Sequence, residues 1–117
     1  MPAVTFYHNP RCSKSSNTLE LLEEHGVHPK IVLYLETPLT RAEISGLLGK
    51  LGLTAGEVVR RGEDQYKASG LGKDSSDEQI LAAMAKHPKL IERPIVVRGN
   101  KAVLGRPPEN VLELLEA

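Results

Sequence analysis

Residues 3–26 read AVTFYHNPRCSKSSNTLELLEEHG, and this stretch decides the fold. Ala3 to Tyr7 is rich in β-branched and aromatic residues and is followed by His8-Asn9-Pro10, a turn signal, so it predicts a short strand. A helix should begin close to Cys12, bury a stripe of leucines and end at Gly26. Strand, loop and helix are the first half of a βαβ unit.

The next segments extend this plan. Residues 30–35 form a nearly continuous apolar run, which predicts a strand covered on both faces and parallel to the first strand through a right-handed crossover. Thr40 with Glu43 and Thr54 with Glu57 are capping boxes that open helices. Residues from about 40 to 87 are therefore expected to be wholly helical.

The C-terminal part predicts a hairpin and a last helix. Ile95 to Arg98 and Ala102 to Leu104 are strand-like and flank the tight turn Gly99-Asn100, and Pro107-Pro108-Glu109 starts a helix. The whole order predicts an α/β, thioredoxin-like fold with a mixed four-stranded sheet flanked by helices on both faces. We expect residues 1–117 to form a single domain, with a helical insertion at about 40–87.

The composition excludes several classes of function. Lys and Arg number 15 and Asp and Glu also number 15, so no overall positive field would hold nucleic acid or an anionic membrane. No signal-peptide pattern or membrane-length apolar run occurs, which predicts a cytoplasmic protein. The single cysteine excludes an intrachain disulfide framework and leaves either an inert or a reactive thiol.

Cys12 has the setting of a reactive thiol. At a helix N-terminus, backbone N–H groups and the helix dipole favour negative charge, and Arg11 and Lys14 add cations. Such settings lower a cysteine pKa from about 8.5 to ~3.5–7.5. The same N–H groups, with Asn9 and Ser15 and the neighbouring serines, could cradle a tetrahedral oxyanion beside the sulfur.

Two other interpretations of these residues are weaker. A free cysteine is often a small buried hydrophobe, but the neighbours of Cys12 are Pro, Arg, Ser and Lys. The four histidines do not form a metal-binding pattern, because His25 and His28 straddle a predicted helix end. We therefore expect no metal and no bound cofactor.

The chain resembles the glutaredoxin-coupled arsenate reductase family over most of its length. The resemblance is carried by Tyr7 to Ser15 with Asn17-Thr18-Leu19, Leu33 to Pro38, Val59-Arg60-Arg61, Glu92 to Val97, and Gly105 to Glu109. It implies a monomeric enzyme that reduces arsenate or a similar oxyanion to arsenite, with glutathione as co-substrate and glutaredoxin as partner. It also implies a cis peptide bond before Pro94.

The resemblance assigns roles to residues at the matching positions. Cys12 would be the nucleophile, and His8 would help to keep its thiolate ionised. Arg60, Arg93 and Arg106 would bind the oxyanion, a role that suits forked guanidinium donors.

Two alternatives stay open at this point. The loop around Cys12 is unusually basic and rich in hydroxyl groups, which suits a glutathione-dependent thiol-disulfide reductase with a substrate other than arsenate. The chain also resembles the Spx-like regulators, which bind RNA polymerase and sense redox state through C-x-x-C. Ser15 stands where those regulators have their second cysteine.

Overall fold

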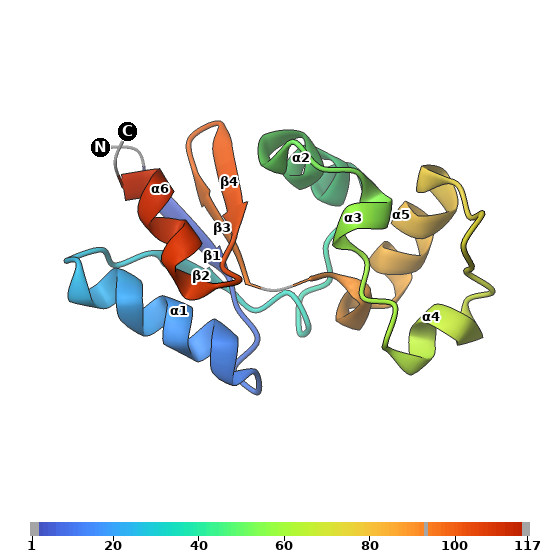
Figure 1. Cartoon of the computed structure of the whole chain (residues 1–117), viewed down its shortest axis with the longest axis horizontal. Helices are drawn as coiled ribbons and strands as arrows, with labels where there is room; N and C mark the ends of the chain where they lie inside the picture. The colour runs from blue at the N-terminus through green and yellow to red at the C-terminus, as the bar shows by residue number, and fades with distance from the viewer. Residues whose placement is uncertain (1–2, 93, 116–117) are drawn as a thin grey trace. The chain divides into compact units, whose positions relative to one another are not determined.

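The computed structural model describes residues 3–92 and 94–115. The chain divides into two compact units, one made of Met1–Thr37 with Arg93–Ala117 and the other of Pro38–Glu92. Figure 1 shows the elements of both units along the chain. The helical segment expected at about 40–87 lies in the second unit.

The first unit contains the sheet. Its strands are β1 (Val4–Tyr7), β2 (Lys30–Val32), β3 (Ile95–Arg98) and β4 (Lys101–Leu104). The strand order is β2-β1-β3-β4, with β1 parallel to β2 and antiparallel to β3, and β3 antiparallel to β4. The predicted mixed four-stranded sheet and its hairpin are therefore confirmed.

Strand β2 differs from the prediction. The apolar run was expected to give a strand covered on both faces, but β2 ends at Val32 and lies at the edge of the sheet. The chain turns directly afterwards, because the carbonyl of Leu33 accepts from the amides of Glu36 and Thr37. Tyr34 is buried in this turn, whereas Ile31 on the strand is exposed.

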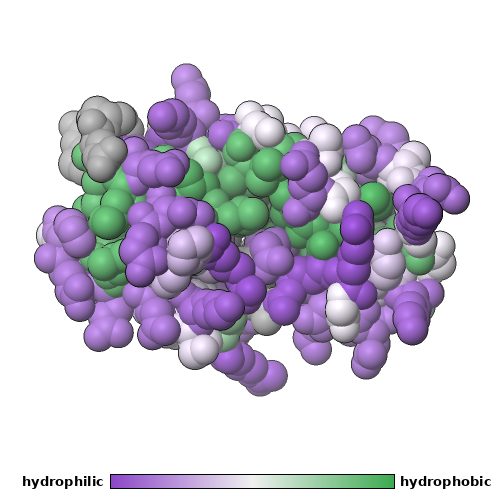
Figure 2. All heavy atoms as spheres, viewed as in Figure 1, coloured by the Kyte–Doolittle hydropathy of each residue, from purple (hydrophilic) through white to green (hydrophobic). Residues whose placement is uncertain are grey.

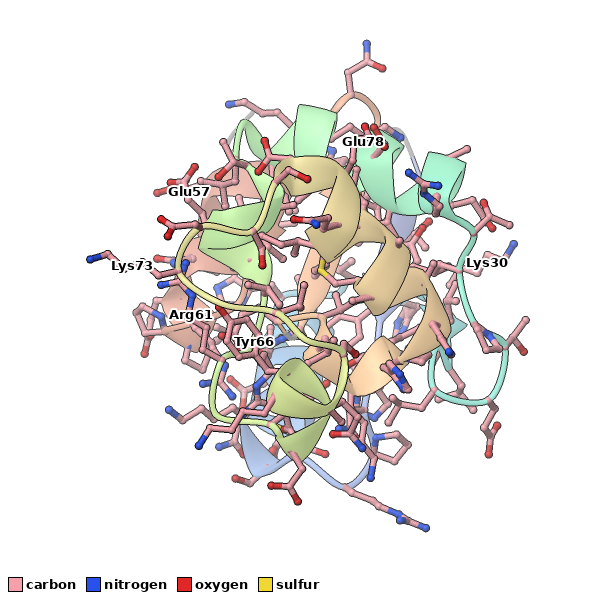
Figure 3. The ribbon with its side chains drawn as sticks, turned by 90° about the vertical axis from the view of Figure 1, so that its right-hand side faces the viewer. Lys30, Glu57, Arg61, Tyr66, Lys73 and Glu78 are labelled. Atoms are coloured by element: carbon pink, nitrogen blue, oxygen red, sulfur yellow. The ribbon has the colours of Figure 1, made fainter. Side chains whose placement is uncertain are left out.

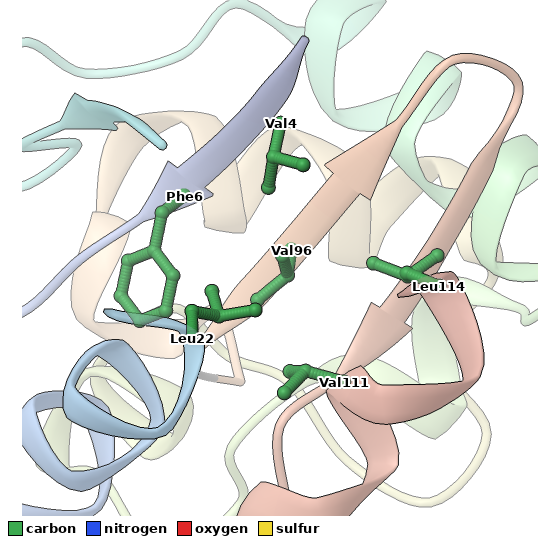
Figure 4. Close-up of a cluster of buried hydrophobic side chains, with 6 residues drawn as sticks. All are labelled: Val4, Phe6, Leu22, Val96, Val111 and Leu114. Atoms are coloured by element: carbon green, nitrogen blue, oxygen red, sulfur yellow. The ribbon is translucent and has the colours of Figure 1, made fainter. Parts of the chain in front are cut away.

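Helices of the first unit cover one face of the sheet. They are α1 (Ser13–Glu24), the 3-10 helix η2 (Pro108–Val111) and α6 (Leu112–Leu115). The last helix was predicted to start at the prolines, and it does so as a 3-10 turn. The core between helices and sheet is shown in Figure 4 and consists of Val4, Phe6, Leu22, Val96, Val111 and Leu114.

The second unit is built from helices. They are α2 (Arg41–Leu51), α3 (Ala55–Val58), α4 (Asp64–Ala68), α5 (Asp77–Lys86) and the 3-10 helix η1 (Pro88–Leu90). Thr40 starts α2 with a complete capping box, as its spacing from Glu43 predicts, and Ser76 starts α5 with another. Helix α5 packs against α2 and α3 through apolar residues that include Ile44, Ile80 and Met84.

The surface is largely polar on the face drawn in Figure 2, where hydrophilic side chains separate the apolar ones. Within the described ranges, no helix combines the length and the hydrophobicity that crossing a membrane requires.

Candidate active site

Cys12 is the N-cap residue of α1 and follows the loop that leaves β1. Its backbone is extended, with φ −102° and ψ 117°. Its amide donates to the carbonyl of Asn9 at 3.0 Å, and its own carbonyl accepts from the amide of Ser16 at 3.1 Å. The cysteine is partly exposed, and in the described part of the chain no side chain caps the helix that it begins. The sulfur therefore lies at the positive end of the α1 dipole.

Asn9 holds the loop in shape. Its Oδ1 atom accepts from the amide of Arg11 at 3.0 Å, and the residue is 9% exposed. This side chain-to-backbone bond is typical of an Asx turn, which fixes the backbone two residues further on. Asn9 thus positions the peptide immediately before Cys12, and the predicted contact of its side chain with an oxyanion stays a prediction.

Ser15 joins the loop to His8 from inside the fold. The serine is fully buried, and its Oγ atom accepts from the amide of Asn9 at 3.2 Å. The same oxygen lies 2.7 Å from Nδ1 of His8. Since the serine hydroxyl carries one proton, it can donate that proton to Nδ1 while it accepts from Asn9. The serine oxygen can also accept from both groups, so the direction of the bond to His8 depends on the tautomer of the imidazole.

The environment of His8 disfavours the charged form of its ring. Burial lowers the pKa of its imidazole below the ordinary 6.5, because desolvation disfavours the charged ring. The ring also packs edge-on against Phe6, with the ring centroids 5.4 Å apart. The contact that the structure gives His8 in this loop is its hydrogen bond to Ser15, and its predicted role in keeping the Cys12 thiolate ionised stays a prediction.

Arg106 supplies the cation at Cys12. Its Nη2 atom lies 4.0 Å from Sγ of Cys12, across 94 positions of sequence. The carbonyl of Arg106 accepts from Nδ2 of Asn110 at 3.0 Å, and the peptide bond from Arg106 to Pro107 is cis. The resemblance had placed a cis bond before Pro94, and that bond lies outside the described residues because Arg93 does.

Arg60 belongs to the second unit and is surrounded by carboxylates there. Its Nη1 atom is 3.7 Å from Oε1 of Glu63, and its Nε atom is 3.9 Å from Oε1 of Glu92. Arg60 and Glu92 border an open cavity of about 680 Å³, which is lined by Gly56, Glu57, Val59, Arg60, Arg61, Gly62 and Glu92. Glu57 and Arg61 are labelled in Figure 3. The Arg60 side chain is 22% exposed, so small anions can reach it from this cavity.

Of the predicted residues, the structure brings together Cys12, His8, Asn9, Ser15 and Arg106. Arg60 lies in the second unit, and Arg93 is outside the described residues. In the described ranges, no three His, Cys, Asp or Glu side chains gather in a way that could hold a metal ion.

Sequence reasoning assigned no role to Thr18 or Gly105, which connect the two ends of the site. The Oγ1 atom of Thr18 donates to the carbonyl of Gly105 at 3.2 Å. One signal was available: Thr18 lies four residues before Leu22, on the buried face of α1, so it is a polar residue at a core position.

The arrangement places a thiol and a guanidinium side by side in the first unit. A sulfur at a helix N-terminus with a guanidinium beside it is a combination that favours a thiolate and attracts an oxyanion. The fold and this cysteine together define a thioredoxin-like protein with a single thiol.

Comparison with known proteins identifies the family. The model of the ArsC family matches residues 7–114, nearly the whole chain. This chain belongs to the ArsC family.

Relatives and solved structures agree with this assignment. An arsenate reductase of Neisseria meningitidis serogroup A is 44% identical over 98% of this chain and 100% of its own. The protein YfgD of Escherichia coli K12, whose name gives no activity, is 54% identical over 96% of each chain. The structure of an arsenate reductase from Vibrio cholerae superposes with a TM-score of 0.91 at 49% identity, covering 96% of this chain and 97% of that one.

Proposed function

We propose that this protein is an arsenate reductase in which the thiolate of Cys12 attacks the substrate and glutathione and glutaredoxin supply the electrons. The observation that carries the proposal is the 4.0 Å approach of the Arg106 guanidinium to the Cys12 sulfur at the start of α1. The arsenate reductases among its relatives support the choice of substrate.

The charges around Cys12 suit both binding and attack. The helix dipole and Arg106 favour the thiolate over the thiol. The same guanidinium can donate two parallel hydrogen bonds to an arsenate oxygen pair, which would hold arsenic next to the sulfur. As the sulfur attacks, negative charge on the arsenate oxygens grows, and a fixed cation stabilises that charge most in the transition state.

The first step forms a bond between sulfur and arsenic. The Cys12 thiolate attacks the arsenic(V) atom, and one arsenate oxygen leaves as water after it is protonated. The product is a Cys12–S–arsenic(V) adduct, in which no electron has yet been transferred.

The second step transfers two electrons. A glutathione thiolate attacks the Cys12 sulfur, the sulfur–arsenic bond breaks, and its electron pair leaves with arsenic as arsenite. Cys12 and glutathione are left as a mixed disulfide. A glutaredoxin thiol then attacks the glutathione sulfur and releases the Cys12 thiolate. A second glutathione reduces glutaredoxin, so one arsenate consumes two glutathione thiols.

Arg60 and Arg93 are proposed to bind the oxyanion as well, as the family resemblance implies. Arg60 presents its guanidinium beside Glu63 and Glu92, at 3.7 and 3.9 Å, distances beyond an ideal hydrogen bond. An arsenate oxygen could therefore compete for its donors. Arg93 is included on the ground of the family resemblance.

The loop residues act through geometry in this proposal. Ser15, bonded to both the Asn9 amide and His8, fixes the turn that presents Cys12. Ser15 would contribute its backbone N–H, in the first turn of α1, to the oxyanion, whereas the N–H of Asn9 already donates to the Ser15 hydroxyl. The cycle consumes reduced glutathione, so we place the enzyme in the cytoplasm, where thiols are kept reduced, and expect it to act as a monomer.

The two alternative functions make different demands on the same loop. An Spx-like redox switch needs a second thiol near Cys12, and Ser15 holds that position with its hydroxyl already engaged by His8. A glutathione-dependent thiol reductase needs only Cys12, and it would form the mixed disulfide without arsenate.

The test is arsenite formation by the purified protein with glutathione, glutaredoxin and NADPH-coupled recycling. Wild type should turn over arsenate, and Cys12→Ser should not. Because Cys12 is the only cysteine, iodoacetamide should abolish turnover by modifying this one site. If NADPH consumption with a glutathionylated thiol, measured without glutaredoxin, requires this protein while arsenate is not reduced, the protein is the thiol reductase; if Cys12→Ser still reduces arsenate, the mechanism is wrong.

A further inference from the structure

Thr18 connects the helix that begins at Cys12 to the segment that carries Arg106. The residue is fully buried in α1. Its Oγ1 atom lies 2.7 Å from the carbonyl oxygen of Lys14 and 3.2 Å from that of Gly105, so its single proton is shared between these two acceptors. A bond to the carbonyl four residues earlier is common for threonine in a helix. The bond to Gly105 spans 87 positions of sequence and is particular to this fold.

The bond to Gly105 acts directly on Arg106. The carbonyl of Gly105 and the amide of Arg106 belong to one planar peptide unit, so a hydrogen bond to that carbonyl orients the unit from which Arg106 starts. On the other side of Gly105, its amide donates to the carbonyl of Pro94 at 2.9 Å. Gly105 is therefore held by hydrogen bonds at both its amide and its carbonyl.

The packing around this junction leaves no room for adjustment. A Cβ atom on Gly105 would lie 2.8 Å from Cγ of Pro94 and 2.8 Å from Cγ2 of Thr18. Because real Cβ atoms essentially never come this close, the Thr18 methyl group and Pro94 fit tightly against the glycine backbone. The position of Thr18 therefore determines where the peptide unit before Arg106 can lie.

We propose that Thr18 is a positioning residue that holds the Arg106 guanidinium beside the Cys12 sulfur through its hydroxyl group. The proposal rests on the proposed function insofar as Cys12 is the nucleophile. Thr18 touches neither the substrate nor the reacting sulfur in this mechanism. It acts on the reaction only through Arg106.

Two substitutions separate the hydroxyl group from the methyl group. Thr18→Val keeps the shape and removes the donor, whereas Thr18→Ser keeps the donor and removes the methyl group. Thr18→Val should slow iodoacetamide alkylation of Cys12 at neutral pH by about threefold to tenfold, as expected for one lost hydrogen bond. It should lower kcat/KM for arsenate similarly, and Thr18→Ser should restore most of both rates.

A double-mutant cycle distinguishes positioning from general damage to the fold. In an Arg106→Gln background, Thr18→Val should have no further effect on alkylation, because the group it positions is absent. The proposal would be overturned if Thr18→Val slowed alkylation of Cys12 as much in the Arg106→Gln background as in the wild-type background. It would also be overturned if the Thr18→Val protein were alkylated at the wild-type rate at every pH. If Thr18→Val does not fold, Thr18→Ala serves in the same cycle.

The alkylation assay also keeps this proposal separate from the proposed function. It needs no arsenate, glutathione or glutaredoxin, so it reports on Thr18 even if the wild-type protein turns over another substrate. If the wild-type protein does not reduce arsenate, the proposed function is wrong. The role of Thr18 is then still decided by the double-mutant cycle, in which the alkylation rate of Cys12 is measured.

Discussion

Nη2 of Arg106 lies 4.0 Å from Sγ of Cys12, although 94 positions separate the two residues. The contact depends on the junction of Thr18, Gly105 and Pro94, which joins α1 to the segment after β4. A small sheet, helix α1 and the segment that follows β4 are thus enough to place a guanidinium beside a thiol.

Arg106→Gln should weaken the site more than any other single change outside Cys12. It removes a charged donor, and hydrogen bonds to charged groups contribute about 1.5–3 kcal/mol, or roughly 10- to 150-fold in rate. We expect kcat/KM for arsenate to fall within that range and alkylation of Cys12 at neutral pH to slow several-fold. Stopped-flow alkylation and steady-state kinetics measure the two effects.

The matched control is Arg41→Gln. Arg41 is an exposed arginine at the start of α2 whose guanidinium pairs with Glu78 on the surface. Exposed pairs of this kind contribute little. Equal rates for Arg106→Gln and Arg41→Gln would remove Arg106 from the mechanism.

Arg60→Gln should lower kcat/KM for arsenate by about tenfold or more if its guanidinium binds the oxyanion, since a charge-assisted hydrogen bond is lost. Alkylation of Cys12 should stay at the wild-type rate, because iodoacetamide is uncharged and has no anionic group for Arg60 to bind. The two assays together therefore separate substrate binding from thiol activation. Slower alkylation without a change in arsenate kinetics would contradict the assigned role.

Gly105→Ala should destabilise the protein by about 1–3 kcal/mol, the usual cost of overpacking a core. The added methyl group would lie 2.8 Å from both Pro94 and Thr18. Urea unfolding measures the change in free energy. Gly46→Ala is the control, because a Cβ atom there meets nothing within 4 Å and alanine favours a helix interior. A Gly105→Ala protein as stable as wild type would show that the junction can relax.

Local patterns predicted much of this fold correctly. The strand, loop and helix around Cys12 depend on periodicity, turn residues and helix termini within a few positions of sequence. The capping box at Thr40 is equally local, because it depends only on the spacing of Thr40 and Glu43. β2 was predicted too long, because the apolar run 30–35 contains both the strand and the buried Tyr34 of the following turn.

Long-range contacts at the site were not readable from the sequence. Glu63 is three residues from Arg60 and could have been expected as its partner, but Glu92 reaches Arg60 only through the fold. The bond from Thr18 to Gly105 spans 87 positions. Likewise, the lowered pKa of His8 depends on its burial, which a strand-end histidine does not reveal.

His8 should make the stability of the protein depend on pH. Burial lowers its pKa in the folded state below the 6.5 of an exposed imidazole, so the unfolded chain binds more protons between those two values. The contribution of His8 to the free energy of unfolding is complete above pH 6.5 and is lost as the pH falls through the lowered pKa. Each unit of depression corresponds to ~1.4 kcal/mol.

Urea unfolding between about pH 8 and about pH 5 tests this dependence, with His8→Gln as the variant that cannot titrate. Wild type should lose more stability than His8→Gln on acidification, although the variant starts lower because its amide replaces a ring packed against Phe6 and bonded to Ser15. His28→Gln is the control for replacing a histidine as such: His28 is exposed after α1, so its substitution should change the free energy of unfolding little. Parallel curves for wild type and His8→Gln would mean that His8 is not desolvated in the folded protein.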